Sequence, residues 1–325
     1  MMQERFASDA ASKPVPVRMA LLGCGIGHSL SPVLYQAGYA YLGIQGSYEC
    51  FDCARDTLVR DFLQDEGAGS GFHALNFTTP YKQLAFGESA VQAASAKLAQ
   101  GANLLVRRKG RWLALNTDGQ GFVEAAQRVG CDFAGKRVVV CGTGSTALSI
   151  AHACALAGSA AILLLSRNQK RASDVQRAFE QRFSQLAHAT VDLGSKTAGE
   201  RSLAQAQRLT KIAANTYDQA QAALGAADIV VNATPLGLNA GDLSPCNTAL
   251  LRPGQWAFDC VYGHGETAFV QGVRRAGCIV HDGRGMLACQ AAANLLAVCD
   301  IAGIPVPSDP CLQDRLTDAL FAALF

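Results

Sequence analysis

A short β-branched run ends directly on a glycine-rich turn near the middle of the chain, and this feature constrains the fold most. Residues 137–141 predict a buried strand, and residues 145–157 follow as an Ala-rich helix. The turn between them reads Gly-x-Gly-x-x-Ala. In this setting the first glycine permits the tight turn, the second lets the backbone approach a pyrophosphate, and a small third residue lets helix and strand pack closely. Because another strand is expected at residues 161–165, we favour a dinucleotide-binding unit over a plain glycine turn. The candidate cofactor residues here are Gly142, Thr143, Gly144, Ser145, Thr146 and Ala147.

The residues after the next predicted strand indicate which dinucleotide binds. NAD sites usually place an acidic residue there for the ribose hydroxyls, whereas this chain has Ser166, Arg167 and Asn168. A guanidinium beside a hydroxyl suits a 2′-phosphate. Lys170 and Arg171 follow, and cations at a helix N-terminus oppose the helix dipole, so they are poor structural choices. The pattern favours NADP, with NAD as the alternative; the competing interpretation is a solvated helix start.

The rest of the chain alternates short apolar runs with helical patterns, which is typical of α/β domains with parallel sheets. The 325 residues, 50% of them hydrophobic, can form two medium domains that meet near residue 118. Predicted strands are residues 17–22, 47–51, 72–76, 137–141, 161–165, 228–233 and 256–261, with a hairpin at 103–108 and 111–115. Predicted helices are residues 32–42 (N-capped by Ser31), 83–99, 120–129, 145–157, 286–302 and 309–324. The long polar stretch between the strands at 161–165 and 228–233 predicts an extra helix or a mobile insertion around residues 192–215.

Charge and cysteine usage narrow the partner classes and the compartment. A net charge of +2 gives no reason to expect nucleic acid or an anionic membrane as a partner. No apolar run approaches the roughly 18 residues of a membrane-spanning helix, and the charged N-terminal segment does not resemble a signal peptide. We therefore expect a cytoplasmic protein whose 12 cysteines are reduced thiols. Cys50 and Cys53 form the one C-x-x-C, without a second pair at zinc spacing, so no metal site is expected. The oligomeric state is left open, with a homodimer as one option.

Two segments ahead of the glycine turn each carry one half of a candidate proton-handling pair. Lys82 ends the segment Asn-Phe-Thr-Thr-Pro-Tyr-Lys, and Asp118 lies within Asn-Thr-Asp-Gly. A lysine near an apolar strand end can act as an acid or base, and a cleft is expected where two domains meet. The alternative interpretations are a solvated lysine and an aspartate in a turn.

Polar residues elsewhere offer substrate contacts. Ser29 and Ser31 stand two residues apart before a helix start, where a carboxylate could accept from both hydroxyls and from nearby N–H groups. On these residues alone, a helix cap and a solvated serine are the simpler interpretation. Asn103 could bond a substrate hydroxyl or cap a hairpin.

In combination, the segments resemble the shikimate dehydrogenase family, which includes quinate/shikimate enzymes. The motifs His-Ser-x-Ser-Pro, Asn-x-Thr-x-Pro-x-Lys, Asn-Thr-Asp-Gly-x-Gly, Asn-Ala-Thr, Asp-x-Val-Tyr and Gly-Met-Leu-x-x-Gln begin at residues 28, 76, 116, 232, 259 and 285. Gly-Ala-x-Asn is present at residues 101–103, less one intervening residue. The motifs occur in the family order from about residue 21 to residue 296, which makes chance agreement remote.

The resemblance implies a layout and a set of roles. An N-terminal α/β substrate domain (residues 1–118) would precede a Rossmann-like NADP-binding domain (residues 119–286), and the C-terminal helices (residues 287–325) would return to the first domain. Lys82 and Asp118 would be the catalytic pair. The substrate carboxylate and ring hydroxyls would be held by Ser29, Ser31, Thr78, Asn103, Tyr262 and Gln290, and the cofactor also by Thr234 and Gly285. The implied reaction is the reversible, NADP-dependent reduction of 3-dehydroshikimate to shikimate by hydride transfer.

The chain also departs from the usual family pattern. The departures are Gly25 for a proline, Leu104 for a threonine, Gly263-His264 for Asn-Pro, and Ser145 for a frequent glycine. They put the substrate in question, so quinate or an amino analogue of shikimate, with NAD or NADP, is the alternative. A metabolite sensor that binds without turnover is the alternative of another class, and retention of Lys82 and Asp118 argues against it.

Overall fold

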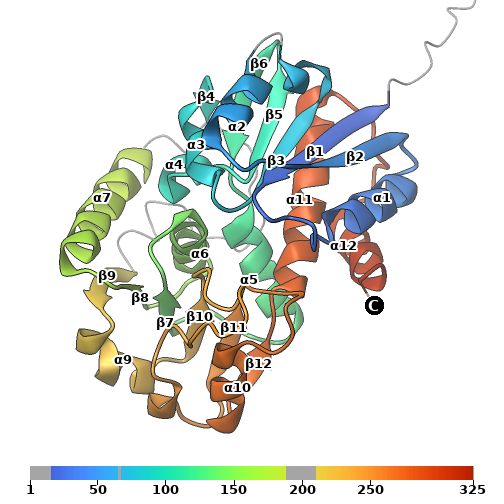
Figure 1. Ribbon diagram of the computed structural model, residues 1–325. Helices are drawn as coiled ribbons and strands as arrows, with labels where there is room; N and C mark the ends of the chain where they lie inside the picture. Colours follow the sequence, from blue (N-terminus) through green and yellow to red (C-terminus); the bar gives the residue numbers. More distant parts are fainter. Residues whose placement is uncertain (1–15, 65–66, 188–209, 325) are drawn as a thin grey trace, which may run out of the picture.

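The computed structural model describes residues 16–64, 67–187 and 210–324, which contain two six-stranded sheets with helices packed on both faces (Figure 1). The expected α/β fold, with a Rossmann-like part, is confirmed. The predicted position of the insertion, residues 192–215, lies mostly outside the described residues. Its last residues belong to a strand rather than a helix, because Lys211–Thr216 pairs in parallel with the strand Ala161–Ser166.

The first sheet has the strand order β2-β1-β3-β5-β6-β4. Its strands are β1 (Val17–Gly23), β2 (Gly46–Asp52), β3 (Ala74–Phe77), β4 (Val91–Gln92), β5 (Leu104–Arg108) and β6 (Arg111–Leu115). Its helices are α1 (Ser31–Leu42), α2 (Asp56–Leu63), α3 (Lys82–Gly87) and α4 (Ala94–Ala99), with a 3-10 turn at Ala68–Gly71. Side chains alternate along β1, so Met19 packs into one apolar cluster and Ala20 into the cluster on the opposite face. The sheet is therefore buried on both sides at β1.

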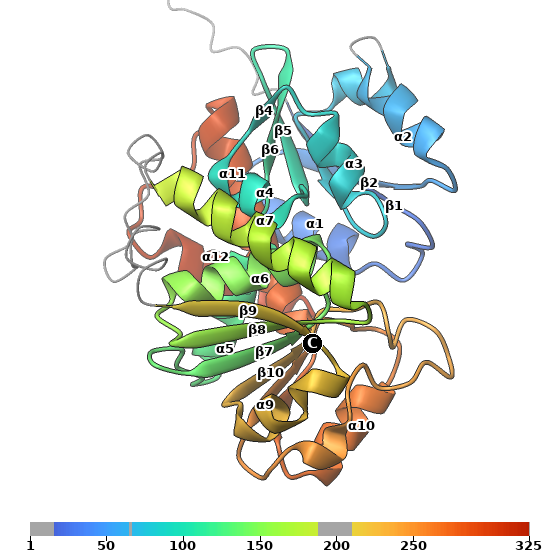
Figure 2. The ribbon, with the colours of Figure 1, turned by 90° about the vertical axis from the view of Figure 1, so that its left-hand side faces the viewer.

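The second sheet is parallel throughout, with the order β12-β11-β10-β7-β8-β9. Its strands are β7 (Arg137–Cys141), β8 (Ala161–Ser166), β9 (Lys211–Thr216), β10 (Ile229–Asn232), β11 (Trp256–Asp259) and β12 (Ile279–His281). Its helices are α5 (Asp118–Arg128), α6 (Ser145–Leu156), α7 (Gln169–Ala187), α9 (Gln221–Ala226) and α10 (Ala268–Arg275), with 3-10 turns at Asp218–Ala220 and Thr248–Leu250. Figure 2 shows α6 and α7 on the face toward the first sheet and α9 and α10 on the other. The strand order reverses between β7 and β10, where doubly wound sheets bind ligands.

The last two helices, α11 (Arg284–Ala302) and α12 (Leu312–Ala322), pack on the first sheet together with α1. α11 also packs against α5, so one helix touches both halves of the molecule (Figure 1). An 18-residue window of α11 has a mean hydropathy of 1.5, so the expectation that no run is long and apolar enough to span a membrane is wrong. Half of that window is buried inside the protein, and its polar residues Gln290 and Asn294 bond to other elements. These contacts are typical of a core helix.

Two local predictions are also wrong. The expected helix over residues 83–99 is split into α3, β4 and α4. The side chains of Ser89 and Gln92 both donate to the Phe86 carbonyl oxygen at the end of α3, at 2.7 and 2.9 Å, and β4 then pairs with β6. Tertiary pairing thus overrides the helix propensity of the Ala-rich run. Ser31 does not cap α1 either: Leu30 holds that position, and the Ser29 hydroxyl accepts from the Ser31 N–H at 3.3 Å.

Candidate active site

A cavity of about 900 Å³ lies where the carboxyl ends of strands from both sheets meet. Its walls include residues at or just after the ends of β1, β3, β7, β8 and β10, the usual place for a ligand site in α/β proteins. The predicted residues that line it are Ser29, Ser31, Thr78, Lys82, Asn103, Asp118, Gly142, Thr143, Gly144, Ser145, Thr146, Ser166, Arg167, Arg171, Thr234, Tyr262 and Gln290. Almost the whole predicted set is thus brought to one place.

Three predicted cofactor residues lie away from this cavity. Ala147 is fully buried where α6 packs on the sheet, which is the packing role that its small size suggests. Lys170 pairs with Asp174 one helical turn along α7 at 2.8 Å and is 86% exposed. Gly285 faces Ala125 on α5 and Phe321 on α12, on the far side of α11 from the cavity.

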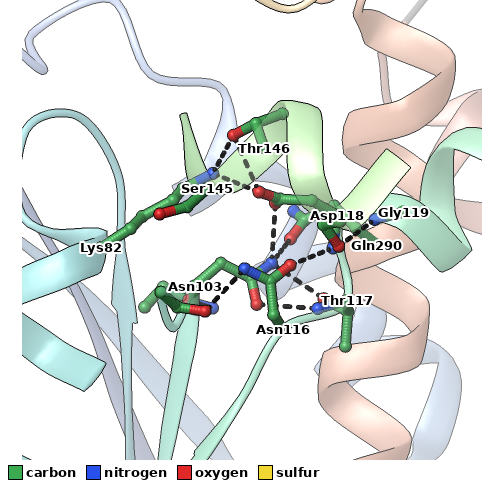
Figure 3. A network of polar contacts seen from close by, with 12 residues as sticks. Lys82, Asn103, Asn116, Thr117, Asp118, Gly119, Ser145, Thr146 and Gln290 are labelled. Atoms are coloured by element: carbon green, nitrogen blue, oxygen red, sulfur yellow. Dashed lines mark hydrogen bonds and ion pairs between the residues drawn. The ribbon is translucent and has the colours of Figure 1, made fainter. Parts of the chain in front are cut away.

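Lys82 and Asp118 are the first residues of α3 and α5 and form an ion pair in the cavity wall (Figure 3). Lys82 Nζ donates to Asp118 Oδ2 at 2.5 Å, and the two side chains are 17% and 5% exposed. Because Asp118 lies in the first turn of α5, the helix dipole stabilises its carboxylate. The Asp118 N–H donates to Asn116 Oδ1 at 3.1 Å, which fixes the backbone at this helix start. The ammonium group is therefore held at the cavity by a buried, oriented carboxylate.

Thr146, from the first turn of α6, completes this cluster. Its hydroxyl donates to Asp118 Oδ2 at 3.0 Å and accepts from Lys82 Nζ at 3.1 Å (Figure 3). The sequence placed Thr146 only in the cofactor turn, so its contact with Lys82 and Asp118 is new. The glycine turn and the Lys–Asp pair are thus in direct contact.

Asn103 and Gln290 form the amide side of the site. Asn103 Nδ2 faces Thr117 Oγ1, Asp118 Oδ1 and Gln290 Oε1 at 2.8, 3.0 and 3.1 Å. Asn103 Oδ1 accepts from the Thr117 N–H at 2.9 Å. An amide nitrogen has two hydrogens for these three acceptors, so one acceptor remains available to a ligand hydroxyl.

The hydroxyls of Ser29, Ser31 and Tyr262, which we call the hydroxyl cluster, also line the cavity. Burial raises the pKa of Tyr262, which keeps its phenol a donor, and its hydroxyl hydrogen-bonds with Ser29. Ser31 is nearly buried at 6% exposure and contacts the hydroxyl of Tyr48. The hydroxyl cluster comes from α1, the segment before it and the segment after β11, and its donors suit a carboxylate.

The glycine turn fits a bound pyrophosphate. Gly142 has φ of +119°, and a Cβ there would lie 3.0 Å from the carbonyl oxygen of Ala233, so only glycine fits without strain. A Cβ at Gly144 would meet nothing within 4 Å, which leaves open space beside the N-terminus of α6. Arg171 Nη2 donates to the Thr143 carbonyl oxygen at 3.2 Å and ties the turn to the start of α7. Thr234, after β10, is held by Asn232 through bonds of 2.6 and 3.0 Å.

Two glycines of the Asn-Thr-Asp-Gly-x-Gly motif serve helix packing. A Cβ at Gly119 would lie 2.0 Å from the carbonyl oxygen of Ser149 on α6. At Gly121 it would lie 2.7 Å from the backbone nitrogen of Gln290 on α11. The Ser149 hydroxyl also accepts from the Gly119 N–H at 2.9 Å. The close approach of α5 to α6 and α11 therefore sets where Asp118 and Gln290 lie.

Several residues at or behind the cavity were not among the residues predicted from the sequence. The rings of His28 and His264 meet edge to face with centroids 4.4 Å apart, and they join the segments after β1 and β11. Asn294 and Thr117 support the amides from below. The spacing of Gln290 and Asn294, four residues apart on one helix face, was an available signal. Leu104, a departure from the family pattern, is fully buried in the core and does not line the cavity. Within the described ranges, no group of three His, Cys, Asp or Glu residues is placed to hold a metal ion.

Comparisons with known proteins agree with this arrangement. Residues 21–105 match the family described as the shikimate dehydrogenase substrate binding domain. The chain is 32% identical over 277 residues to a shikimate dehydrogenase (NADP(+)) of Moorella thermoacetica, with 85% of each chain covered. It is 33% identical over 291 residues to the protein of the same name from Bordetella avium, which covers 87% of this chain and 90% of that one. A solved structure of shikimate 5-dehydrogenase from Thermus thermophilus, in complex with NADP(H) and shikimate, superposes with a TM-score of 0.69 at 25% identity, over 94% of this chain and 99% of that chain. The chain belongs to the shikimate dehydrogenase family.

Proposed function

We propose that the protein is an NADP-dependent oxidoreductase that reversibly reduces 3-dehydroshikimate to shikimate. The observation that carries this proposal is the contact of Thr146 with both Lys82 and Asp118. It places a proton-handling pair beside the turn that fits a dinucleotide, within the cavity that also holds the hydroxyl cluster. The names of the relatives, shikimate dehydrogenase (NADP(+)), support the same reaction.

The chain's residues fit NADP. The open N-terminus of α6 offers unpaired N–H groups to a pyrophosphate. Arg167 lines the cavity beside Tyr217 at the end of β8, and Ser166 is buried next to it. No carboxylate stands at this strand end to accept from ribose hydroxyls, so a 2′-phosphate suits it better. When bound, NADPH would supply the hydride.

The substrate would lie between the hydroxyl cluster and the Lys–Asp pair. Ser29, Ser31 and Tyr262 would donate to its carboxylate, while Asn103 and Gln290 would contact ring hydroxyls. Thr78 lines the same wall. Holding both ends of a rigid ring in this way would fix the ketone carbon relative to the α6 end of the cavity.

Lys82 would handle the proton. As negative charge builds on the carbonyl oxygen, the ammonium group would stabilise it and donate a proton. Asp118 would orient Lys82 through their 2.5 Å contact, and Thr146 would hold Asp118 in turn. In the reverse direction the neutral amine of Lys82 would accept the proton from the substrate hydroxyl.

A kinetic screen tests the function. The purified protein is assayed with shikimate and with quinate, each with NADP and with NAD. The proposal predicts the highest kcat/KM for shikimate with NADP. A preference for quinate would contradict shikimate as the substrate, and a preference for NAD would contradict NADP as the cofactor. Binding of shikimate without turnover with either cofactor would support a metabolite sensor instead.

Three further features belong to this proposal. We take residues 1–118 with 287–325 as the substrate domain and residues 119–286 as the NADP-binding domain. We place the enzyme in the cytoplasm, which is supported by the absence of disulfides in the described chain, where all 12 cysteines are free thiols. A homodimer stays a prediction that light scattering of the purified protein would test.

A further inference from the structure

Asn294 is a fully buried amide one helical turn beyond Gln290 on α11, and it lies behind the cavity wall rather than in it. Its Nδ2 donates to Gln290 Oε1 at 3.1 Å and to the Tyr35 hydroxyl at 3.2 Å. Its Oδ1 accepts from the Thr117 hydroxyl at 2.7 Å. A buried amide costs free energy unless it is hydrogen-bonded, and here both of its hydrogens and its oxygen are used.

These bonds determine which way the neighbouring groups point. Thr117 gives its one hydroxyl hydrogen to Asn294 Oδ1, so Thr117 Oγ1 can only accept from Asn103 Nδ2, 2.8 Å away. Asn103 must therefore turn its NH₂ group toward Thr117 and Asp118. Its oxygen is left for the Thr117 N–H, as the 2.9 Å contact requires.

Asn294 also orients the side-chain amide of Gln290. Its Oε1 accepts from Asn294 Nδ2 at 3.1 Å, and Asn103 Nδ2 lies at the same distance from it, so both neighbours favour the oxygen rather than the nitrogen of the Gln290 amide at this position. Its Nε2 contacts the Leu287 carbonyl oxygen at 3.2 Å with one hydrogen and keeps the other. The Gln290 amide is thus held in one orientation, with its oxygen toward Asn294 and the second Nε2 hydrogen left as a donor for a ligand in the cavity.

A second path from Asn294 leads to the other side of the site. Its partner Tyr35 stacks on Tyr48 with ring centroids 4.1 Å apart, and the Tyr48 hydroxyl donates to Asn76 Oδ1 at 3.0 Å. Asn76 Nδ2 in turn donates to the Asn103 carbonyl oxygen at 3.1 Å. Asn294 is therefore linked to the side chain of Asn103 through Thr117 and, by a longer route, to the backbone of Asn103 through Tyr35, Tyr48 and Asn76.

We propose that Asn294 is a positioning residue that fixes the donor and acceptor polarity of Gln290 and Asn103 toward the substrate's ring hydroxyls. The proposal rests on the proposed function for the identity of the ligand as shikimate. The orientation of the two amides does not depend on that identity.

The kinetic test replaces Asn294 with residues of similar size. Asn294→Leu removes the donor to Gln290 Oε1 and the acceptor for the Thr117 hydroxyl. The side-chain amide of Gln290 can then rotate and exchange the positions of its oxygen and nitrogen. We expect KM for shikimate to rise roughly 3- to 10-fold, the value of one net hydrogen bond, with kcat changed less than about 2-fold. Asn294→Asp should raise KM at least as much. The new carboxylate attracts the NH₂ group of Gln290, so Gln290 Oε1 turns toward the ligand.

A double-mutant cycle separates positioning from simple destabilisation. In a Gln290→Ala background, Asn294→Leu should raise KM by a smaller factor than it does in the wild type, because one of the two groups that it positions is gone. The matched control is Thr317→Val on α12, which removes the hydrogen bond that another fully buried residue donates to Glu124 at 3.1 Å. This control should lower stability without raising KM. Additive effects in the cycle, or an unchanged KM in a folded Asn294→Leu protein, would overturn the proposal.

A measurement on the ligand-free protein distinguishes the positioning role of Asn294 from the proposed function. In NMR spectra, the side-chain amide hydrogens of Asn103 and Gln290 should exchange slowly in the wild type and at least 10-fold faster in Asn294→Leu. Unchanged exchange would contradict the positioning role even if shikimate is the substrate. Faster exchange in a protein that does not turn over shikimate would uphold the positioning role and contradict the proposed function.

Discussion

Thr146 donates its hydroxyl hydrogen to Asp118 at 3.0 Å, so the helix that follows the glycine turn is tied directly to the ion pair with Lys82. The same turn of α6 is where a pyrophosphate would lie. One helical turn would therefore set the position of the cofactor and of the proton-handling pair together. This arrangement explains why two motifs more than 20 residues apart in the sequence belong to one site.

The first prediction concerns Lys82. Lys82→Ala should lower kcat by about 10²–10⁴-fold, the usual contribution of a positioned acid–base group, while KM changes much less. Steady-state kinetics in both directions would measure this. Lys97→Ala, at an exposed position on α4, is the control and should leave kcat unchanged. Near-normal turnover by Lys82→Ala would remove Lys82 from the mechanism.

The second prediction concerns the hydroxyl cluster. Replacing Ser29 and Ser31 together by Ala should raise KM for shikimate strongly, because a carboxylate in a partly buried site would lose two donors. Tyr262→Phe should raise KM less, since one of several donors is lost and the ring remains. If the double variant keeps the wild-type KM, the serines only support the segment before α1.

How much of this site could be predicted from the sequence depends on the kind of signal each residue leaves. The glycine turn was predictable because a strand, a turn and a helix leave their pattern in adjacent residues. The position of Lys82 next to Asp118 followed from the family resemblance, because 36 residues separate them and no local pattern joins them. The contact of Thr146 and the orientation imposed by Asn294 required coordinates, since both join elements that are distant in the chain. The helix expected at residues 83–99 was wrong because strand pairing at β4 is a tertiary effect.

The third prediction concerns Gly119. A methyl group there would lie 2.0 Å from the Ser149 carbonyl oxygen, so Gly119→Ala must push α5 away from α6. Such overpacking costs about 1–3 kcal/mol of unfolding free energy. It should also displace Asp118, the preceding residue, and lower kcat. Urea denaturation and kinetics measure the two effects. Gly130→Ala, where a Cβ would meet nothing within 4 Å but φ is +91°, is a control that should lower stability and leave kcat unchanged.

The last prediction concerns the choice of cofactor. Arg167 stands exposed at the end of β8, lines the cavity, and is expected to face the adenosine 2′-phosphate. A charge-assisted hydrogen bond contributes about 1.5–3 kcal/mol, or about 10–150-fold in preference for NADP over NAD. Arg167→Ala should lose most of that preference while NAD activity stays nearly unchanged. Lys170→Ala is the matched control: its ammonium is 86% exposed, already pairs with Asp174 and lies away from the cavity, so the preference should hardly move.

Adding Ser166→Asp to Arg167→Ala should carry the preference toward NAD. A carboxylate at the end of β8 repels the 2′-phosphate and can accept from both ribose hydroxyls, which is how NAD sites select their cofactor. Because Ser166 is only 5% exposed, the double variant needs a thermal unfolding measurement beside the kinetics, to separate lost folding from changed selectivity. The ratio of kcat/KM for NADP to that for NAD is the deciding quantity. A wild-type enzyme that prefers NAD, or an Arg167→Ala enzyme with unaltered NADP kinetics, would overturn the assignment of Arg167.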